Sequence, residues 1–144
     1  MQQARHIREP FSDIDILDIQ DIFLKNGLHY IKVDDLTSGR ELVNLFLDSL
    51  NYYSNVACLT TSNYPLYSKA TNLYNELEQG GYLQSNFQLK IEEFFLEQFY
   101  YDFVWVEATR ELVRSEWTTA CFRQMKHFKL DQLIPILIVS YDKG

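Results

Sequence analysis

Apolar side chains recur along this chain at two different spacings, and together these predict alternating helices and strands. The apolar positions have helical spacing in residues 15–24, 40–50, 67–79, 85–100 and 111–130. Short stretches that are apolar throughout occur at residues 28–33, 56–60, 103–106 and 136–139. Strands without polar alternation are typical of a parallel sheet that is covered on both faces. The pattern therefore predicts an α/β fold with three layers, in which helices flank an open parallel sheet of about four strands.

Local signals refine the ends of these elements. Asn26-Gly27 is typical chemistry for the end of the first helix, and Ser85 with Gln88 predicts a capping box at the start of the fourth. The first strand, residues 28–33, would leave an apolar edge. Because an open apolar edge invites association, we expect this edge to be paired or covered.

Length and composition predict one folded domain. The 144 residues are 47% hydrophobic with few glycines and prolines, so we expect a flexible polar arm at residues 1–12 and a domain at residues 13–144. The chain ends soon after the fourth predicted strand, which leaves open that it is part of a longer protein. Cys58 and Cys121 lie in apolar stretches without metal or redox spacing, and we expect both to be buried thiols.

Charge and hydropathy narrow the classes of partner. The formal net charge is −7 without a strongly basic stretch, which argues against nucleic acid. No apolar run approaches the roughly 20 residues that span a bilayer. The N-terminus lacks the apolar region of a signal peptide, so we expect a cytoplasmic protein. Protein partners or further copies of the chain remain, and docking to a membrane-associated complex stays open.

The segment between the first strand and the next helix has the position of a phosphate loop. Aligning the pattern GxxxxGK[ST] with residues 34–41 keeps one glycine, Gly39. Asp34 replaces the first glycine, Arg40 the lysine and Glu41 the hydroxyl that binds magnesium. Carboxylates here repel a polyphosphate, and a guanidinium does not replace a compact ammonium. This loop is expected to bind nucleotide poorly, and the other interpretation is an ordinary turn with Thr37 or Ser38 as the helix N-cap.

Two further strand ends complete the candidate site. Glu107 follows residues 103–106, which is the position of a Walker B acid that orients magnesium and water. Ser140 follows the last predicted strand, where related enzymes carry a polar sensor residue. For both residues, the simpler interpretation is a polar side chain that ends a buried strand.

The other groups of polar and aromatic residues do not have the spacing of a catalytic or metal site. We therefore expect no catalytic residue, metal or cofactor. His6, His29 and His127 lack the spacing of a metal site. The acidic run in residues 13–21 lacks the glycine and glutamate of an EF-hand and is expected to be a solvated helix face. Aromatic residues in or near predicted loops are candidates for a contact surface. They are Tyr52, Tyr53, Tyr64 and Tyr67.

Residues 26–63 resemble the opening of RecA/KaiC-type domains, which run from a glycine into a strand, phosphate loop, helix and second strand. Residues 101–107 and 133–141 fit the Walker B strand and the strand after it. Among members without a working phosphate loop, residues 27–65 and 102–144 resemble the N-terminal NTPase-like domain of the cellulose-synthesis regulator BcsE. That resemblance implies a RecA-like fold with a degenerate P-loop and a role in docking secretion-system components.

The resemblance and the residues together predict a non-catalytic interaction or regulatory domain, a pseudo-NTPase that docks onto itself or onto partner proteins. An alternative is a nucleotide-binding NTPase that uses Arg40 and Glu107. Another is a cyclic-dinucleotide sensor, although the RxxD signature is absent and Arg110 and Arg114 have the spacing of one exposed helix face. The layout is also similar to SulA-type cell-division inhibitors and to the small Elongator subunits.

Overall fold

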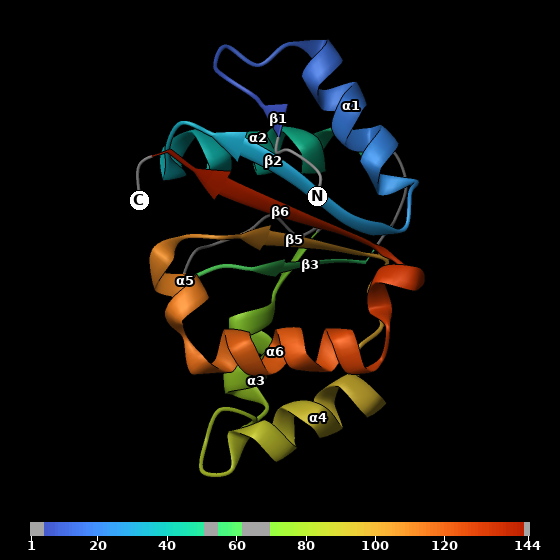
Figure 1. The fold of residues 1–144 in the computed structure, drawn as a ribbon, viewed down its shortest axis with the longest axis vertical. Coiled ribbons are helices and arrows are strands. Elements are labelled where there is room, and N and C mark those ends of the chain that lie inside the picture. The colour runs from blue at the N-terminus through green and yellow to red at the C-terminus, as the bar shows by residue number, and fades with distance from the viewer. Residues whose placement is uncertain (1–4, 51–54, 62–69, 143–144) are drawn as a thin grey trace.

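A computed structural model describes residues 5–50, 55–61 and 70–142 of the chain. They form one sheet with the strand order β1-β2-β6-β5-β3-β4, in which every neighbouring pair is parallel. Helices cover both faces, so the fold has three layers (Figure 1). This confirms the predicted α/β class, with six strands in the described residues instead of about four.

The elements follow one another in the order that the sequence pattern predicted, with two additional strands. The strands are β1 (Arg5–His6), β2 (Gly27–Val33), β3 (Val56–Leu59), β4 (Ala70–Asn72), β5 (Phe103–Glu107) and β6 (Pro135–Tyr141). The helices are α1 (Asp13–Phe23), α2 (Leu36–Ser49), α3 (Leu73–Gln79), α4 (Phe87–Glu97), α5 (Arg110–Arg114), α6 (Glu116–His127) and the short 3-10 helix η1 (Leu130–Gln132).

The helices α1 and α2 pack on one face of the sheet, and a group of aromatic rings lies within this mainly aliphatic core. Phe46 of α2 is fully buried, and its ring lies 5.5 Å from Phe103 and 5.7 Å from Trp105 on β5. Phe23 of α1 lies 5.1 Å from the ring of Phe103. Burial of such large rings contributes more than any other contact type to a core of this size. Phe46 is therefore the centre of this half of the core.

The helices α3, α4, α5 and α6 cover the opposite face. Ile91 and Phe94 of α4, Leu112 of α5 and Cys121 of α6 belong there to one buried cluster with Val106 of β5. Because successive residues of a strand point to opposite faces, both halves of the core share the same strands. This explains why the strands are apolar throughout.

β1 and β4 were not predicted. Arg5 and His6, which the sequence placed in a flexible arm, pair in parallel with Ile31 and Lys32 of β2. β2 is therefore flanked by β1 and β6, as expected for an apolar edge that must be covered. Residues 70–72 were expected to be helical, but they pair with β3, and the helix begins only at Leu73. Asn72 caps it by accepting a hydrogen bond from the backbone N–H of Asn75 (3.2 Å).

The predicted boundaries of the helices around α4, α5 and α6 were also wrong. The helix expected at residues 111–130 is broken at Ser115, whose extended backbone separates α5 from α6. The Ser115 hydroxyl donates to the carbonyl of Glu111 (2.8 Å), and such local bonds compete with helix continuation. The capping box of Ser85 and Gln88 does not form, because α4 begins after Asn86. Asn86 has a φ of 61°, a conformation that asparagine tolerates better than most residues.

Candidate functional site

The carboxyl edge of the sheet contains a topological switch point. From β2 the chain crosses into α2 on one face, whereas from β5 it enters α5 and α6 on the other. β6 lies between these two strands. Ligands of open α/β sheets bind in the crevice that this arrangement creates. The polar residues at the ends of β2, β5 and β6 therefore define the candidate site.

At the centre of this edge, Arg40 of α2 and Glu107 of β5 form a bidentate ion pair. Arg40 donates from Nε to Oε2 and from Nη2 to Oε1 of Glu107, each over 3.0 Å. Arg40 Nη2 also lies 3.3 Å from the hydroxyl oxygen of Thr61, beyond the end of β3. The Glu107 side chain is only 5% exposed, and a carboxylate at that depth needs a charged, geometrically matched partner. The predicted phosphate-loop cation and the predicted Walker B acid thus bind each other.

The predicted phosphate loop is mostly helix. The sequence placed a turn at residues 34–39 and a helix from Arg40, but α2 begins at Leu36. Asp35 is the N-cap, and its carboxylate accepts from the backbone N–H of Ser38 (2.8 Å). An aspartate caps at least as well as the Thr37 or Ser38 that the sequence suggested. Only Asp34 and Asp35 connect β2 to α2, so two acids occupy the place of the phosphate-binding loop.

Gly39 serves the packing of α2 against β6. A Cβ on this residue would lie 2.6 Å from Cε1 of Tyr141, closer than side chains tolerate. Burial raises the pKa of the Tyr141 hydroxyl, and the nearby Glu107 carboxylate raises it further. The phenol therefore stays neutral next to the Arg40–Glu107 pair. The close contact with the Tyr141 ring explains why residue 39, which fits the phosphate-loop pattern, is a glycine.

The remaining predicted site residues lie apart from the ion pair. Glu41 is exposed on α2, and its pKa is raised chiefly by the carboxylate of Glu9. Ser140 lies within β6, and its hydroxyl donates to the carbonyl of Ile31 on β2 (3.3 Å). Tyr52, Tyr53, Tyr64 and Tyr67 lie outside the described residues.

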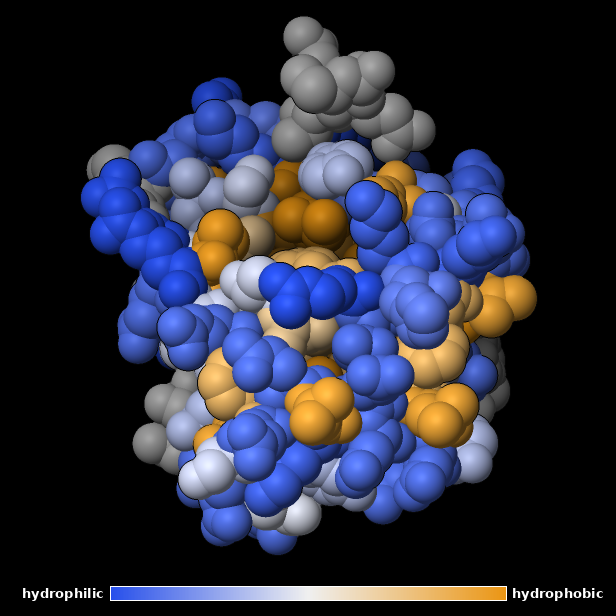
Figure 2. Space-filling model, turned by 60° about the horizontal axis from the view of Figure 1, so that its bottom comes forward, coloured by the Kyte–Doolittle hydropathy of each residue, from blue (hydrophilic) through white to orange (hydrophobic). Residues whose placement is uncertain are grey.

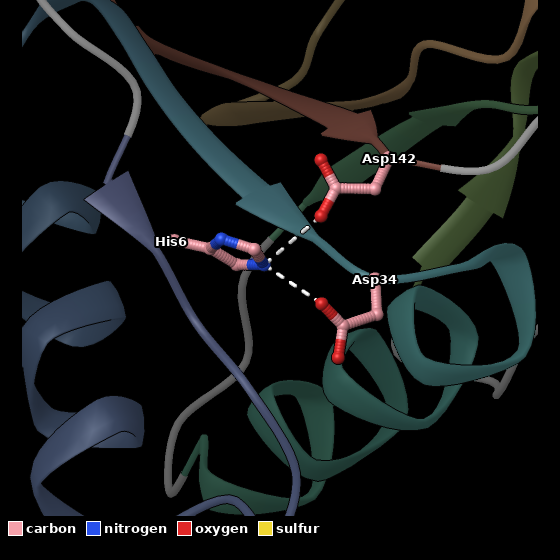
Figure 3. A group of neighbouring side chains, drawn as sticks. All are labelled: His6, Asp34 and Asp142. Carbon is pink, nitrogen blue, oxygen red and sulfur yellow. Dashed lines mark hydrogen bonds and ion pairs between the residues drawn. The ribbon is translucent and has the colours of Figure 1, made fainter.

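A cluster that the sequence did not predict lies at the ends of β1, β2 and β6. Nε2 of His6 lies 2.8 Å from Oδ1 of Asp34 and 3.5 Å from Oδ2 of Asp142 (Figure 3). Lys32 donates to Asp142 over 2.7 Å, and this bond is the main reason that the pKa of Asp142 is lowered. These residues are distant in sequence, so no spacing signal existed. Only their positions at strand ends could have indicated the cluster.

The other side chains that could take part in chemistry do not belong to these two groups of residues. Burial raises the pKa of the Cys58 and Cys121 thiols, as expected for buried cysteines. Arg110 and Arg114 are both exposed on α5. The acidic run of α1 is only partly the solvated face that was expected: Asp13 and Asp21 are exposed, whereas Asp15 and Asp18 are half-buried and pair with Arg5. Across the described ranges, no helix is long and apolar enough to cross a membrane.

The fold and the site define an α/β domain with an all-parallel sheet and a closed, charge-paired centre at its carboxyl edge. Comparison of the chain with protein-family models, with curated proteins and with solved structures gives no match. The resemblance to RecA-like domains therefore rests on the residues and motifs quoted above.

Proposed function

We propose that this chain is a non-catalytic interaction and regulatory domain, a pseudo-NTPase that docks onto itself or onto a protein partner. The observation that carries this proposal is the Arg40–Glu107 pair. Both carboxylate oxygens of Glu107 accept hydrogen bonds from Arg40, so the acid that would orient magnesium and water is already engaged. Arg40, the cation that would meet a phosphate, is engaged in the same bonds.

The connection between β2 and α2 supports the same conclusion. Phosphate binding at a helix start depends on free backbone N–H groups and on a positive potential. Here Asp35 takes the N–H of Ser38, and Asp34 adds a second negative charge. The position of β1 beside β2 agrees with the strand that RecA-type sheets carry there. A link to cellulose synthesis or another secretion system follows from the resemblance to BcsE.

A partly apolar face of the sheet is the candidate docking surface. Leu28 and Tyr30 of β2 are 43% and 37% exposed, on the side of the sheet that α6 covers only in part. Leu28 lines a hollow of about 300 Å³ with Phe122 and Met125 of α6. Figure 2 shows hydrophobic residues in a hollow on this side, bordered by hydrophilic residues. Apolar recesses with polar rims are typical of protein contact sites.

Calorimetric titration with Mg-ATP, Mg-GTP and cyclic di-GMP tests the non-catalytic half of the proposal. We expect no saturable binding up to about 1 mM, which corresponds to binding weaker than about −4 kcal/mol. Saturable binding of a triphosphate, together with its hydrolysis, would refute the proposal. Binding of cyclic di-GMP that is lost in Arg110→Ala or Arg114→Ala would instead favour the sensor alternative.

Sedimentation velocity over a wide concentration range tests the second part of the proposal, that the chain docks onto itself or onto a partner. We expect self-association that Leu28→Ser weakens by at least tenfold, because the substitution places a hydroxyl in the apolar hollow. Leu96→Ser is the matched control, since Leu96 is an exposed leucine on α4 that does not line this hollow. A strict monomer at high concentration would exclude self-docking, and affinity capture with the same two variants would then test for a different protein partner.

A further inference from the structure

One imidazole and two carboxylates converge where three neighbouring strands end. His6 is the last residue of β1, Asp34 directly follows β2, and Asp142 directly follows β6. These strands are adjacent and parallel, so their carboxyl ends meet at one edge of the sheet. Figure 3 shows the three side chains pointing toward one another from these strand ends. We propose that they form a binding site for a divalent transition-metal ion of the zinc class.

The spacing of the ligand atoms fits a single ion. One ligand atom from each of the three side chains lies within 4.8 Å of the others. The distances from His6 Nε2 are 2.8 Å to Asp34 and 3.5 Å to Asp142. Zinc binds nitrogen and oxygen at about 2.0–2.2 Å, so ligands around one tetrahedral ion lie roughly 3.3–3.5 Å apart. The two separations from His6 lie at or within about 0.5 Å of that range, so small side-chain rotations would be enough to seat an ion.

The donor set selects the class of metal. A neutral imidazole with two carboxylates suits zinc and its neighbours in the first transition row, whereas magnesium and calcium prefer oxygen ligands alone. Three protein ligands leave a fourth position for water. The sequence did not indicate this site, because His6, Asp34 and Asp142 are far apart along the chain and have no ligand spacing.

Two cationic side chains compete with the ion. Lys32 Nζ lies 2.7 Å from Asp142, and Arg8 approaches both Asp34 (3.7 Å) and Nδ1 of His6 (3.3 Å). The Lys32 and Arg8 side chains are 41% and 69% exposed, so both can turn into solvent when an ion takes their place. Metal affinity is then set by this exchange, and removal of the Lys32 charge strengthens binding.

A bound ion would fix β1 onto the rest of the sheet. In the described part of the chain, β1 pairs with β2 at Arg5 and His6, and His6 is the ligand that it supplies. An ion that binds only the folded chain raises stability according to its concentration relative to the dissociation constant. The site does not depend on the proposed docking function, because it needs neither the Leu28 hollow nor a partner.

The experiment is calorimetric titration of the untagged chain with Zn²⁺, paired with Co²⁺ absorption spectroscopy and thermal unfolding. We expect one equivalent to bind with Co²⁺ d–d bands, and the unfolding temperature to rise by several degrees. His6→Ala and Asp142→Asn are each expected to weaken binding at least tenfold. His127→Ala, an exposed histidine on α6, is the matched control and should bind as the unaltered chain does.

A second variant keeps the proposal falsifiable if a ligand variant fails to fold. Lys32→Met preserves all three ligands and is expected to bind Zn²⁺ at least threefold more tightly. No binding by the unaltered chain up to 1 mM Zn²⁺, equal binding by His6→Ala, or no gain in Lys32→Met would each overturn the site.

Discussion

Gly39 and Tyr141 are packed so closely that no side chain fits between them. A Cβ on Gly39 would lie 2.6 Å from Cε1 and 3.0 Å from the hydroxyl oxygen of Tyr141. The contact joins the first turns of α2 to the end of β6, close to the Arg40–Glu107 pair. It sets how near α2 lies to the sheet.

Gly39→Ala tests this contact. Alanine favours a helix by about 1 kcal/mol over glycine, but the overlap with the ring is expected to cost more and to lower the free energy of unfolding by about 1–3 kcal/mol. Urea denaturation measures the change. In a Tyr141→Leu background the same substitution should be neutral or stabilising, and an equal loss in both backgrounds would disprove the contact as the cause.

The Arg40–Glu107 pair gives a second prediction. Arg40→Met leaves the Glu107 carboxylate buried without its cation, which is expected to cost about 3–5 kcal/mol of unfolding free energy. Arg40→Met combined with Glu107→Leu should recover much of this loss, because no unpaired charge remains. Arg110→Met, at an exposed arginine, should change stability by no more than about 0.5 kcal/mol. A loss below about 1 kcal/mol in Arg40→Met would contradict the pairing seen here.

The aromatic core under α2 gives a third prediction. Phe46→Ala removes a fully buried ring that contacts Phe103 and Trp105, and we expect a loss of about 3–5 kcal/mol. Leu45→Ala, one residue earlier and 39% exposed, is the matched control and should cost far less. The fluorescence of the two tryptophans, Trp105 and Trp117, during urea unfolding reports both variants. Similar losses at the two positions would place the core elsewhere.

The fourth prediction concerns the pKa of Asp142 and its effect on stability at low pH. The pKa of Asp142 is lowered from its ordinary 3.8, chiefly by the hydrogen bond from Lys32. A carboxyl group with a lower pKa in the folded chain adds stability above its unfolded pKa, and this stability is lost as the pH falls through the folded value. Lys32→Met should raise the Asp142 pKa, which NMR titration of its carboxyl carbon measures. An unchanged Asp142 pKa in Lys32→Met would exclude the bond as the cause.

The sequence predicted the elements whose signal is local and strongly periodic. α2 shows its buried face through Leu42, Val43, Phe46 and Leu47, and β5 is apolar throughout, so both were identified. β1 was missed because a strand of Arg5 and His6 has no apolar pattern and exists only through pairing with β2. β4 was missed because its three residues precede a helix without a breaker between them.

The sequence identified the two central residues of the candidate site, but not the ion pair between them. Arg40 and Glu107 were both singled out, each as part of a nucleotide site, and their distance of 67 positions gave no indication that they bind each other. The start of α2 was misplaced because glycine at position 39 suggests a turn, whereas the cap at Asp35 decides the boundary. Contacts between strand ends depend on strand order, which periodicity does not encode.

The place of β6 has a consequence for how the chain reaches this structure. β6 is the last strand along the described chain, yet it lies between β2 and β5, paired at seven positions with one and four with the other. A nascent chain that has emerged only as far as residue 114 therefore holds both neighbours of a strand not yet made, and such long-range pairing is slow to form. Because β6 pairs with both β2 and β5, a chain that stops before residue 135 lacks the middle of the described sheet instead of a strand at its edge.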